Sequence, residues 1–171
     1  EADLIESNFG GTCSNPDIAV DSNGKAHITY TDSKGNTGDY MDQPDIMYAT
    51  NSSGSFNKEL IYKGYRAEDY GDFYSKGSKI AVDGSNNYYI LSQVREWDGS
   101  QSRHTYSIIV KSNSAGGATD REFYSSTKDL HDIYDITSGG SKVVALYKGQ
   151  GTIKTAELVV EGDTINFNYP T

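Results

Sequence analysis

The chain has 171 residues, a length that suits one domain with a sizeable buried core. Its net charge of −9 argues against nucleic acids and anionic membranes as partners, because both need a basic patch. The 14 tyrosines and 18 glycines, with many Ile, Val, Thr, Asn and Ser residues, favour strands and tight turns over helices. A solvated acidic surface and calcium binding are both compatible with this composition.

No apolar run is long enough to insert into a membrane, and no signal peptide is recognisable. The first residue is Glu1 rather than Met, which suggests processing or trimming and leads us to expect an extracellular or cell-surface location. Cys13 is the single cysteine, so it cannot form a disulfide within the chain. An inert thiol and an intermolecular disulfide are the two alternatives.

In chain order, the first predicted element is a short apolar strand at residues 3–7. The segment 18–28 (IAVDSNGKAHI) then gives a strand, a tight turn rich in Asp, Ser, Asn and Gly, and a second strand. The segment 80–90 (IAVDGSNNYYI) repeats it at an offset of 62 residues (80 − 18). A weaker copy at 134–144 follows at a further offset of 54 (136 − 82).

The second half of each unit repeats as well. Two more strands joined by a short turn are predicted within 46–62, 108–124 and 153–167. Each unit therefore has four strands, and units of this kind are typical of propeller blades. We expect one domain, 1–171, with blades at about 16–62, 78–125 and 132–169.

The segments 16–30 (PDIAVDSNGKAHITY) and 48–56 (YATNSSGSF) resemble the bacterial β-propeller repeat of the sialidase-like, Asp-box-related (BNR-like) kind. The second unit matches this repeat half as well, and the third matches it in outline. The resemblance covers nearly the whole chain and implies a fold, without implying an activity. Ser52 stands where a strict Asp box has Asp, so the motif is degenerate here.

The predicted fold class is all-β: three propeller-like, four-stranded antiparallel blades that form an incomplete ring. Closed propellers have about four to eight blades, so three cannot close a ring alone. Two chains could pair into a six-bladed ring, the chain could be part of a longer propeller, or the three sheets could form an open stack. The strand at 3–7 could also join neighbouring copies into a filament, or could be a frayed terminus.

The predicted connections are short at one face of the propeller and long at the other, so we expect a binding site on the face with long loops. Exposed aromatic rings beside polar side chains are typical of sugar binding, because rings stack on a pyranose and polar groups bond its hydroxyls. The alternative is that these aromatic residues cap the interfaces between blades. The predicted ligand-binding residues are Trp97, Arg95, Tyr65, Tyr70, Tyr74 and Asp98.

The acidic loops suggest calcium, which takes carboxylate and carbonyl oxygens from flexible segments. The predicted metal ligands are Asp32, Asp39 and Asp42, with Asp45 nearby. Their spacing does not follow an EF-hand loop, so a protein without any cofactor is the main expectation.

The sequence shows no catalytic constellation. It has only four arginines, and no motif places them as the substrate-binding triad of a sialidase. The three histidines lack metal-ligand spacing, and no nucleophile elbow is present. We therefore expect a non-catalytic extracellular binding module for glycans that forms homo-oligomers. A self-assembling structural protein is the alternative, and a glycoside hydrolase is the third choice.

Overall fold

The computed structural model describes residues 12–33, 45–62, 78–97, 103–112, 119–124, 132–149, 152–161 and 164–168. Regular structure in these ranges consists of β-strands joined by turns. No helix within them has the length and apolar character needed to cross a membrane.

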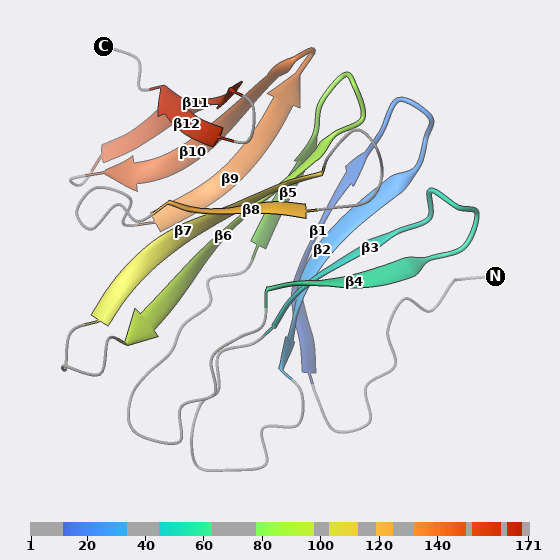
Figure 1. The fold of residues 1–171 in the computed structure, drawn as a ribbon, viewed down its shortest axis with the longest axis horizontal. Coiled ribbons are helices and arrows are strands. Elements are labelled where there is room, and N and C mark those ends of the chain that lie inside the picture. Colours follow the sequence, from blue (N-terminus) through green and yellow to red (C-terminus); the bar gives the residue numbers. More distant parts are fainter. Residues whose placement is uncertain are drawn as a thin grey trace.

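The strands form three antiparallel sheets of four strands each in this part of the chain (Figure 1). Sheet 1 contains β1 (Thr12–Val20), β2 (Ala26–Ser33), β3 (Asp45–Thr50) and β4 (Asn57–Tyr62). Sheet 2 contains β5 (Ser78–Val82), β6 (Tyr88–Trp97), β7 (Arg103–Ser112) and β8 (Thr119–Tyr124). Sheet 3 contains β9 (Asp132–Gly139), β10 (Lys142–Gly149), β11 (Thr152–Glu161) and β12 (Thr164–Asn168).

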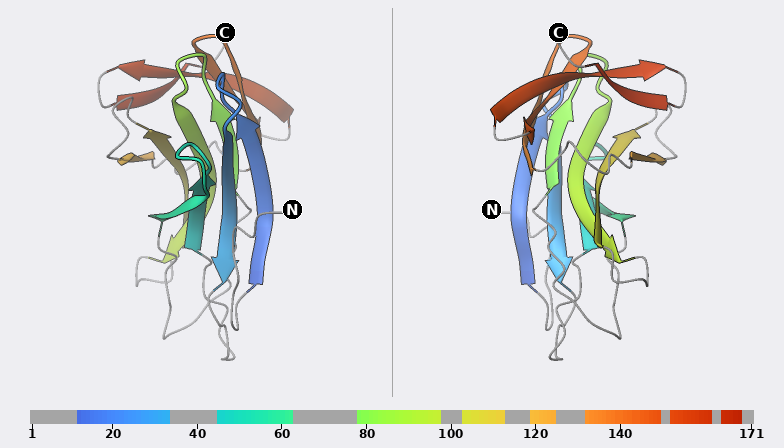
Figure 2. Two further views of the ribbon diagram at one scale, coloured as in Figure 1. Left: turned by 90° about the vertical axis from the view of Figure 1, so that its right-hand side faces the viewer. Right: turned by 90° about the vertical axis from the view of Figure 1, so that its left-hand side faces the viewer.

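In every sheet the strands follow one another in chain order, as expected for blades built from successive hairpins. Sheet 2 lies between sheets 1 and 3, and the edge strands β1, β5 and β9 lie next to one another (Figures 1 and 2). This arrangement confirms the expected all-β, propeller-like fold of four-stranded antiparallel sheets.

Alternation along the strands explains the packing, because successive side chains of a strand point to opposite faces of its sheet. In β5, Ile80 and Val82 face sheet 1, whereas Ala81 faces sheet 3. The interface of sheets 1 and 2 contains Ile46, Tyr48, Ile61, Tyr62, Ile80, Val82, Tyr88 and Ile90. The interface of sheets 2 and 3 contains Ala81, Tyr89, Leu91, Ile136, Val143, Ala145 and Leu158.

The first strand begins earlier than the repeat pattern indicated. β1 starts at Thr12 and passes through Pro16, where the sequence placed the start of the first blade. Its register with β2 shifts between Ser14 and Asp17, and Asn15 has a positive φ of 51°. A bulge accommodates proline within a strand because the bulge removes the need for its missing N–H.

Candidate functional site

The two ends of the sheets differ in their connections. Tight turns join β1 to β2, β5 to β6 and β9 to β10 at the top of Figure 1, and a tight turn joins β3 to β4 at its right-hand side. The strand ends that border residues 34–44, 63–77 and 98–102 lie toward the opposite end. We call these the turn end and the loop end.

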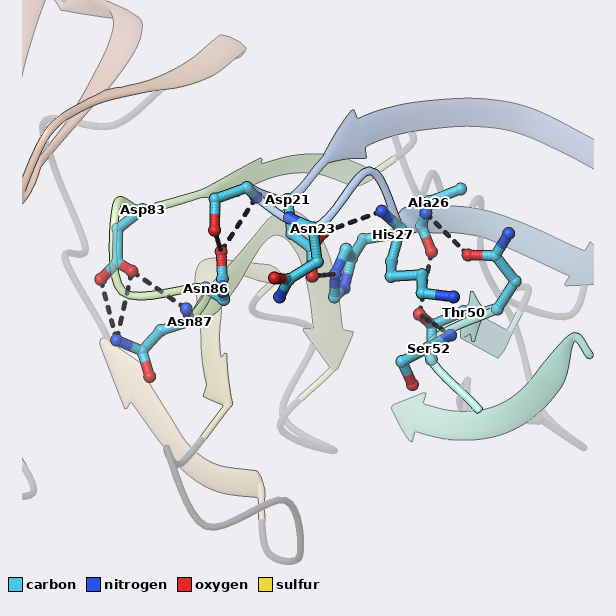
Figure 3. Close-up of polar contacts among 12 residues, drawn as sticks. Asp21, Asn23, Ala26, His27, Thr50, Ser52, Asp83, Asn86 and Asn87 are labelled. Carbon is cyan, nitrogen blue, oxygen red and sulfur yellow. Dashed lines mark hydrogen bonds and ion pairs between the residues drawn. The ribbon is translucent and has the colours of Figure 1, made fainter. Parts of the chain in front are cut away.

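At the turn end, two aspartates hold equivalent turns (Figure 3). The Oδ1 atom of Asp21 accepts hydrogen bonds of 2.8 Å from the backbone N–H groups of Asn23 and Lys25. In the next repeat, the Oδ1 atom of Asp83 accepts bonds of 2.8 and 2.9 Å from the N–H groups of Ser85 and Asn87. The Asp residues flagged by the repeat are therefore turn caps of the kind expected for this residue type.

Adjacent sheets are also joined by their turns. The N–H and hydroxyl groups of Ser22 donate to Oδ1 of Asn86 over 3.0 and 2.8 Å. The N–H group of Gly84 donates to the carbonyl of Gly140 over 2.6 Å. Within sheet 1, Asn51 Oδ1 accepts from Ala26 N over 2.8 Å, which fixes the β3–β4 turn to β2. These contacts give the turn end a structural role.

Behind these turns, His27 lies buried between sheets 1 and 2. Its Nδ1 atom lies 2.6 Å from the hydroxyl of Tyr48, and its Nε2 atom lies 3.6 Å from Oδ2 of Asp21. The rings of Tyr48 and Tyr88 stack with centroids 4.2 Å apart. The His27 ring contacts Tyr48 of sheet 1 and Tyr88 of sheet 2, so it packs between the two sheets.

Burial controls the protonation of His27 and of Tyr48 beside it. Burial lowers the pKa of His27 below its usual 6.5, and the nearby Asp21 carboxylate offsets only part of that effect. Burial also raises the pKa of Tyr48 to about 12. An Asp–His–Tyr series could in principle activate a nucleophile, but the side chains of His27 and Tyr48 are buried between two sheets. We assign them to packing, because a substrate has no access to them.

Toward the loop end, small polar side chains lie beside the apolar core. The hydroxyl groups of Thr29 in β2 and Ser78 in β5 lie 2.5 Å apart, and both are buried between sheets 1 and 2. Nearby, Thr31 donates to the carbonyl of Ser14 over 3.0 Å. The strands that carry these residues thus approach the loop end with a layer of paired hydroxyl groups.

The predicted ligand-binding residues fall into two groups. Arg95 and Trp97 lie in β6, where Trp97 is the last residue of the strand and pairs in register with Arg103 of β7. The expectation that they belong to a loop is wrong, because β6 and β7 form a longer hairpin than the repeat indicated. Outside the described residues lie Tyr65, Tyr70, Tyr74 and Asp98.

The predicted metal ligands are only partly described. Asp32 was expected in a loop, but it lies in β2, where it is buried and directly opposite Asp45 of β3. Asp39 and Asp42 lie outside the described residues. The described ranges contain no group of three side chains suited to a metal ion. The calcium site therefore stays a prediction.

Sequence reasoning missed the polar cluster around the bulge of β1. The side chain of Asn15 donates to the hydroxyl oxygens of Ser14 and Thr31 over 3.2 and 3.4 Å. The dipeptide Asn15–Pro16 could have indicated the bulge, because asparagine tolerates a positive φ and proline is compatible with a bulge.

Comparisons with protein-family models and with curated proteins found no match. A solved structure similar to this chain is a family 117 glycoside hydrolase produced by the marine bacterium Zobellia galactanivorans, with a TM-score of 0.56 at 15% identity. The match covers 94% of this chain and 56% of that chain, so the chain spans little more than half of the neighbour's length. At this identity the likeness shows a common fold.

Proposed function

We propose that this chain is a non-catalytic, extracellular carbohydrate-binding module whose site lies at the loop end around Trp97. The observation that carries the proposal is the position of Trp97 at the end of β6, beside the connection that follows it. Aromatic rings at such strand ends can present a flat apolar surface to a pyranose, and neighbouring polar side chains bond its hydroxyls.

Three features support this proposal. Arg95 lies two positions before Trp97 in β6, and Asp98 follows directly, so charged groups flank the tryptophan in sequence. The segment 63–77, which follows β4 and precedes β5 in the sequence, carries Tyr65, Tyr70 and Tyr74. In addition, a structural neighbour is a glycoside hydrolase, which makes a carbohydrate a reasonable ligand class for this fold.

We further propose that the repeats are of the sialidase-like, Asp-box-related kind and that they serve as a scaffold here. The support is the turn after β3, where Gly54 N–H donates to the Asn51 carbonyl over 2.9 Å and Gly54 has a φ of 100°. Binding without turnover is favoured because His27 and Tyr48 are buried between sheets 1 and 2 and cannot serve as catalytic groups.

The test is a glycan microarray probed with the intact chain and with Trp97→Ala. Loss of a stacking ring typically costs about 2 kcal/mol, so the variant should bind the hits about 10- to 100-fold more weakly. Trp97→Phe, which keeps an aromatic ring, should retain most of the binding. Equal binding by Trp97→Ala and the parent chain would contradict the proposed site.

Turnover is tested on the same hits. Incubation of each bound glycan with the chain, followed by mass spectrometry, should leave the glycan intact. Cleavage that is lost in a carboxylate variant such as Asp98→Asn would instead establish a glycoside hydrolase.

A further inference from the structure

Ser92 of β6 carries a buried hydroxyl group that lacks a hydrogen-bond partner among the described residues. The residue is 1% exposed, and no group in that part of the chain forms a hydrogen bond with its Oγ. Tyr88 and Ile90 pack in the interface of sheets 1 and 2, so Ser92, further along β6 by an even number of residues, faces the same interface. A buried hydroxyl without a partner is costly, because it has lost its hydrogen bonds to water and gained none in return.

A second buried hydroxyl lies directly across sheet 2 from the first. Ser78, the first residue of β5, pairs in register with Ser92 and is also 1% exposed. Its Oγ lies 2.5 Å from the hydroxyl of Thr29 in sheet 1, so Ser78 faces sheet 1 as well. The two serines therefore stand on the same face of sheet 2, at the same level of the interface.

Backbone geometry brings these two side chains close together. The N–H group of Ile80 donates to the Asp17 carboxylate over 2.9 Å, so it points away from β6. Ile80 and its partner Ile90 thus form a non-hydrogen-bonded pair, and the next pair of the same kind, two residues along each strand, is Ser78–Ser92. Cβ atoms in such cross-strand pairs are about 4.5–5.5 Å apart.

The hydrogen bonds of Thr29 determine the direction of the protons in this cluster. Its hydroxyl donates to the carbonyl of Met47 over 3.1 Å. A hydroxyl has one proton to donate, so Ser78 must be the donor in its bond to Thr29. The oxygen of Ser78 therefore keeps a free lone pair, while the hydroxyl of Ser92 keeps a free proton. A group between the two serines has to accept from Ser92 and donate to Ser78.

A single water molecule meets both requirements. Two hydrogen bonds of about 2.8 Å to one water oxygen separate the two bonded oxygens by about 4.6 Å, which matches the spacing of a cross-strand pair. A metal cation suits the position poorly, because it needs a carboxylate when buried. The carboxylates of Asp32 and Asp45 lie on the other face of sheet 1, since Ile46 next to Asp45 faces sheet 2.

We propose that a water molecule is bound between sheets 1 and 2, where it accepts a hydrogen bond from Ser92 and donates one to Ser78. Buried waters typically bind polar groups that the protein itself leaves unsatisfied. Ser78–Ser92 is the last pair of β5 with β6, and beyond it β6 pairs with β7 as far as Trp97. The water therefore fixes the base of the hairpin that carries Trp97, whether or not this hairpin binds a glycan.

Replacement of Ser92 separates a bridged hydroxyl from one that is merely buried. Ser92→Ala should lower the Tm by roughly 2–4 °C, because the water loses a partner and Ser78 loses its donor. Removal of a hydroxyl with no partner at all would relieve its desolvation and leave the Tm equal to or above that of the parent chain, which would overturn the proposal. Ser85→Ala is the matched control, since it makes the same change at an exposed position of the same hairpin and should leave the Tm unchanged.

A double variant tests whether the two serines share one bridge. The Tm loss of Ser78→Ala combined with Ser92→Ala should be smaller than the sum of the two single losses, because either change removes the bridge. Additive losses would overturn the link between them.

A crystal structure of the intact chain identifies the bridging group. Solvent density should lie about 2.6–3.2 Å from both Ser92 Oγ and Ser78 Oγ, and it should disappear in crystals of Ser92→Ala. Either of two results would overturn the water site: a direct hydrogen bond between the two serines, or no density between them.

Discussion

Removal of the Asp83 carboxylate should destabilise the β5–β6 turn and the interface between sheets 2 and 3 together. Oδ1 accepts from Ser85 N–H and Asn87 N–H, while Oδ2 accepts from the Asn87 side chain over 2.9 Å and from the Tyr89 hydroxyl over 3.0 Å. Burial by itself would raise the pKa of Asp83, but these donors outweigh it, so its pKa lies below the usual 3.8. The carboxylate is therefore charged in the folded protein near neutral pH.

The magnitude follows from the bonds that Asp83→Ala removes. A hydrogen bond to a charged group contributes about 1.5–3 kcal/mol, and Tyr89, which is buried, would lose its partner. Since contributions within one network are not additive, we expect a loss of about 3 kcal/mol in the free energy of unfolding. For a chain of this size that corresponds to a decrease in Tm of roughly 6–12 °C.

Thermal unfolding followed by circular dichroism measures this change. Asp83→Asn keeps the Oδ1 acceptor for both turn amides and should lose about half as much. Ser85→Ala leaves its backbone donor in place, and its exposed side chain makes it a suitable control with no expected change. A Tm of Asp83→Ala within about 1 °C of the parent chain would refute the reasoning, since nothing else in the turn replaces the carboxylate.

Two further predictions concern protonation and close backbone contact. The pKa of His27 in the folded chain lies below its usual 6.5, so at a pH below 6.5 the unfolded chain binds more protons than the folded chain. Stability should therefore be highest above pH 6.5 and decrease as the pH falls through the folded pKa of His27. His27→Gln should make the Tm less dependent on pH between pH 7.5 and 5.5. If the Tm of this variant depends on pH as strongly as that of the parent chain, His27 is not the group responsible. A Cβ on Gly84 would lie 3.0 Å from the carbonyl oxygen of Gly140, whereas one on Gly139 meets nothing within 4 Å. Gly84→Ala should cost about 1–3 kcal/mol in chemical denaturation and Gly139→Ala almost nothing, so equal costs would argue against the close contact between sheets.

The repeat in the sequence predicted much of the fold because strand alternation and turn chemistry are local. Asp21 and Asp83 each begin a turn of the same length, and a residue with positive φ stands at Gly24 (73°) and Asn86 (66°). These positions are 62 residues apart (86 − 24), which is the repeat offset itself. The tight turns followed from residue types that tolerate this conformation.

The exposure of Ile18 and Val20 could not be predicted in the same way. Their sequence context is that of Ile80 and Val82, and only the position of the sheet in the stack makes the outcome differ. The length of the β6–β7 hairpin was also missed, because Arg95 and Trp97 are flanked by polar residues that suggested a loop. Register with β7 determines where that strand ends, and register is a property of two segments rather than of one.

The most direct test of the proposed carbohydrate site uses the fact that Trp97 is the single tryptophan of the sequence. Its fluorescence therefore reports on that position alone. We would titrate the chain with cellohexaose, xylohexaose, mannohexaose, laminarihexaose and chitohexaose, and with the strongest hits of the microarray. The account predicts a saturable change in emission for at least one glycan, with the same midpoint as calorimetry. A glycan that binds by calorimetry without changing the emission, or a panel in which none binds, would contradict it.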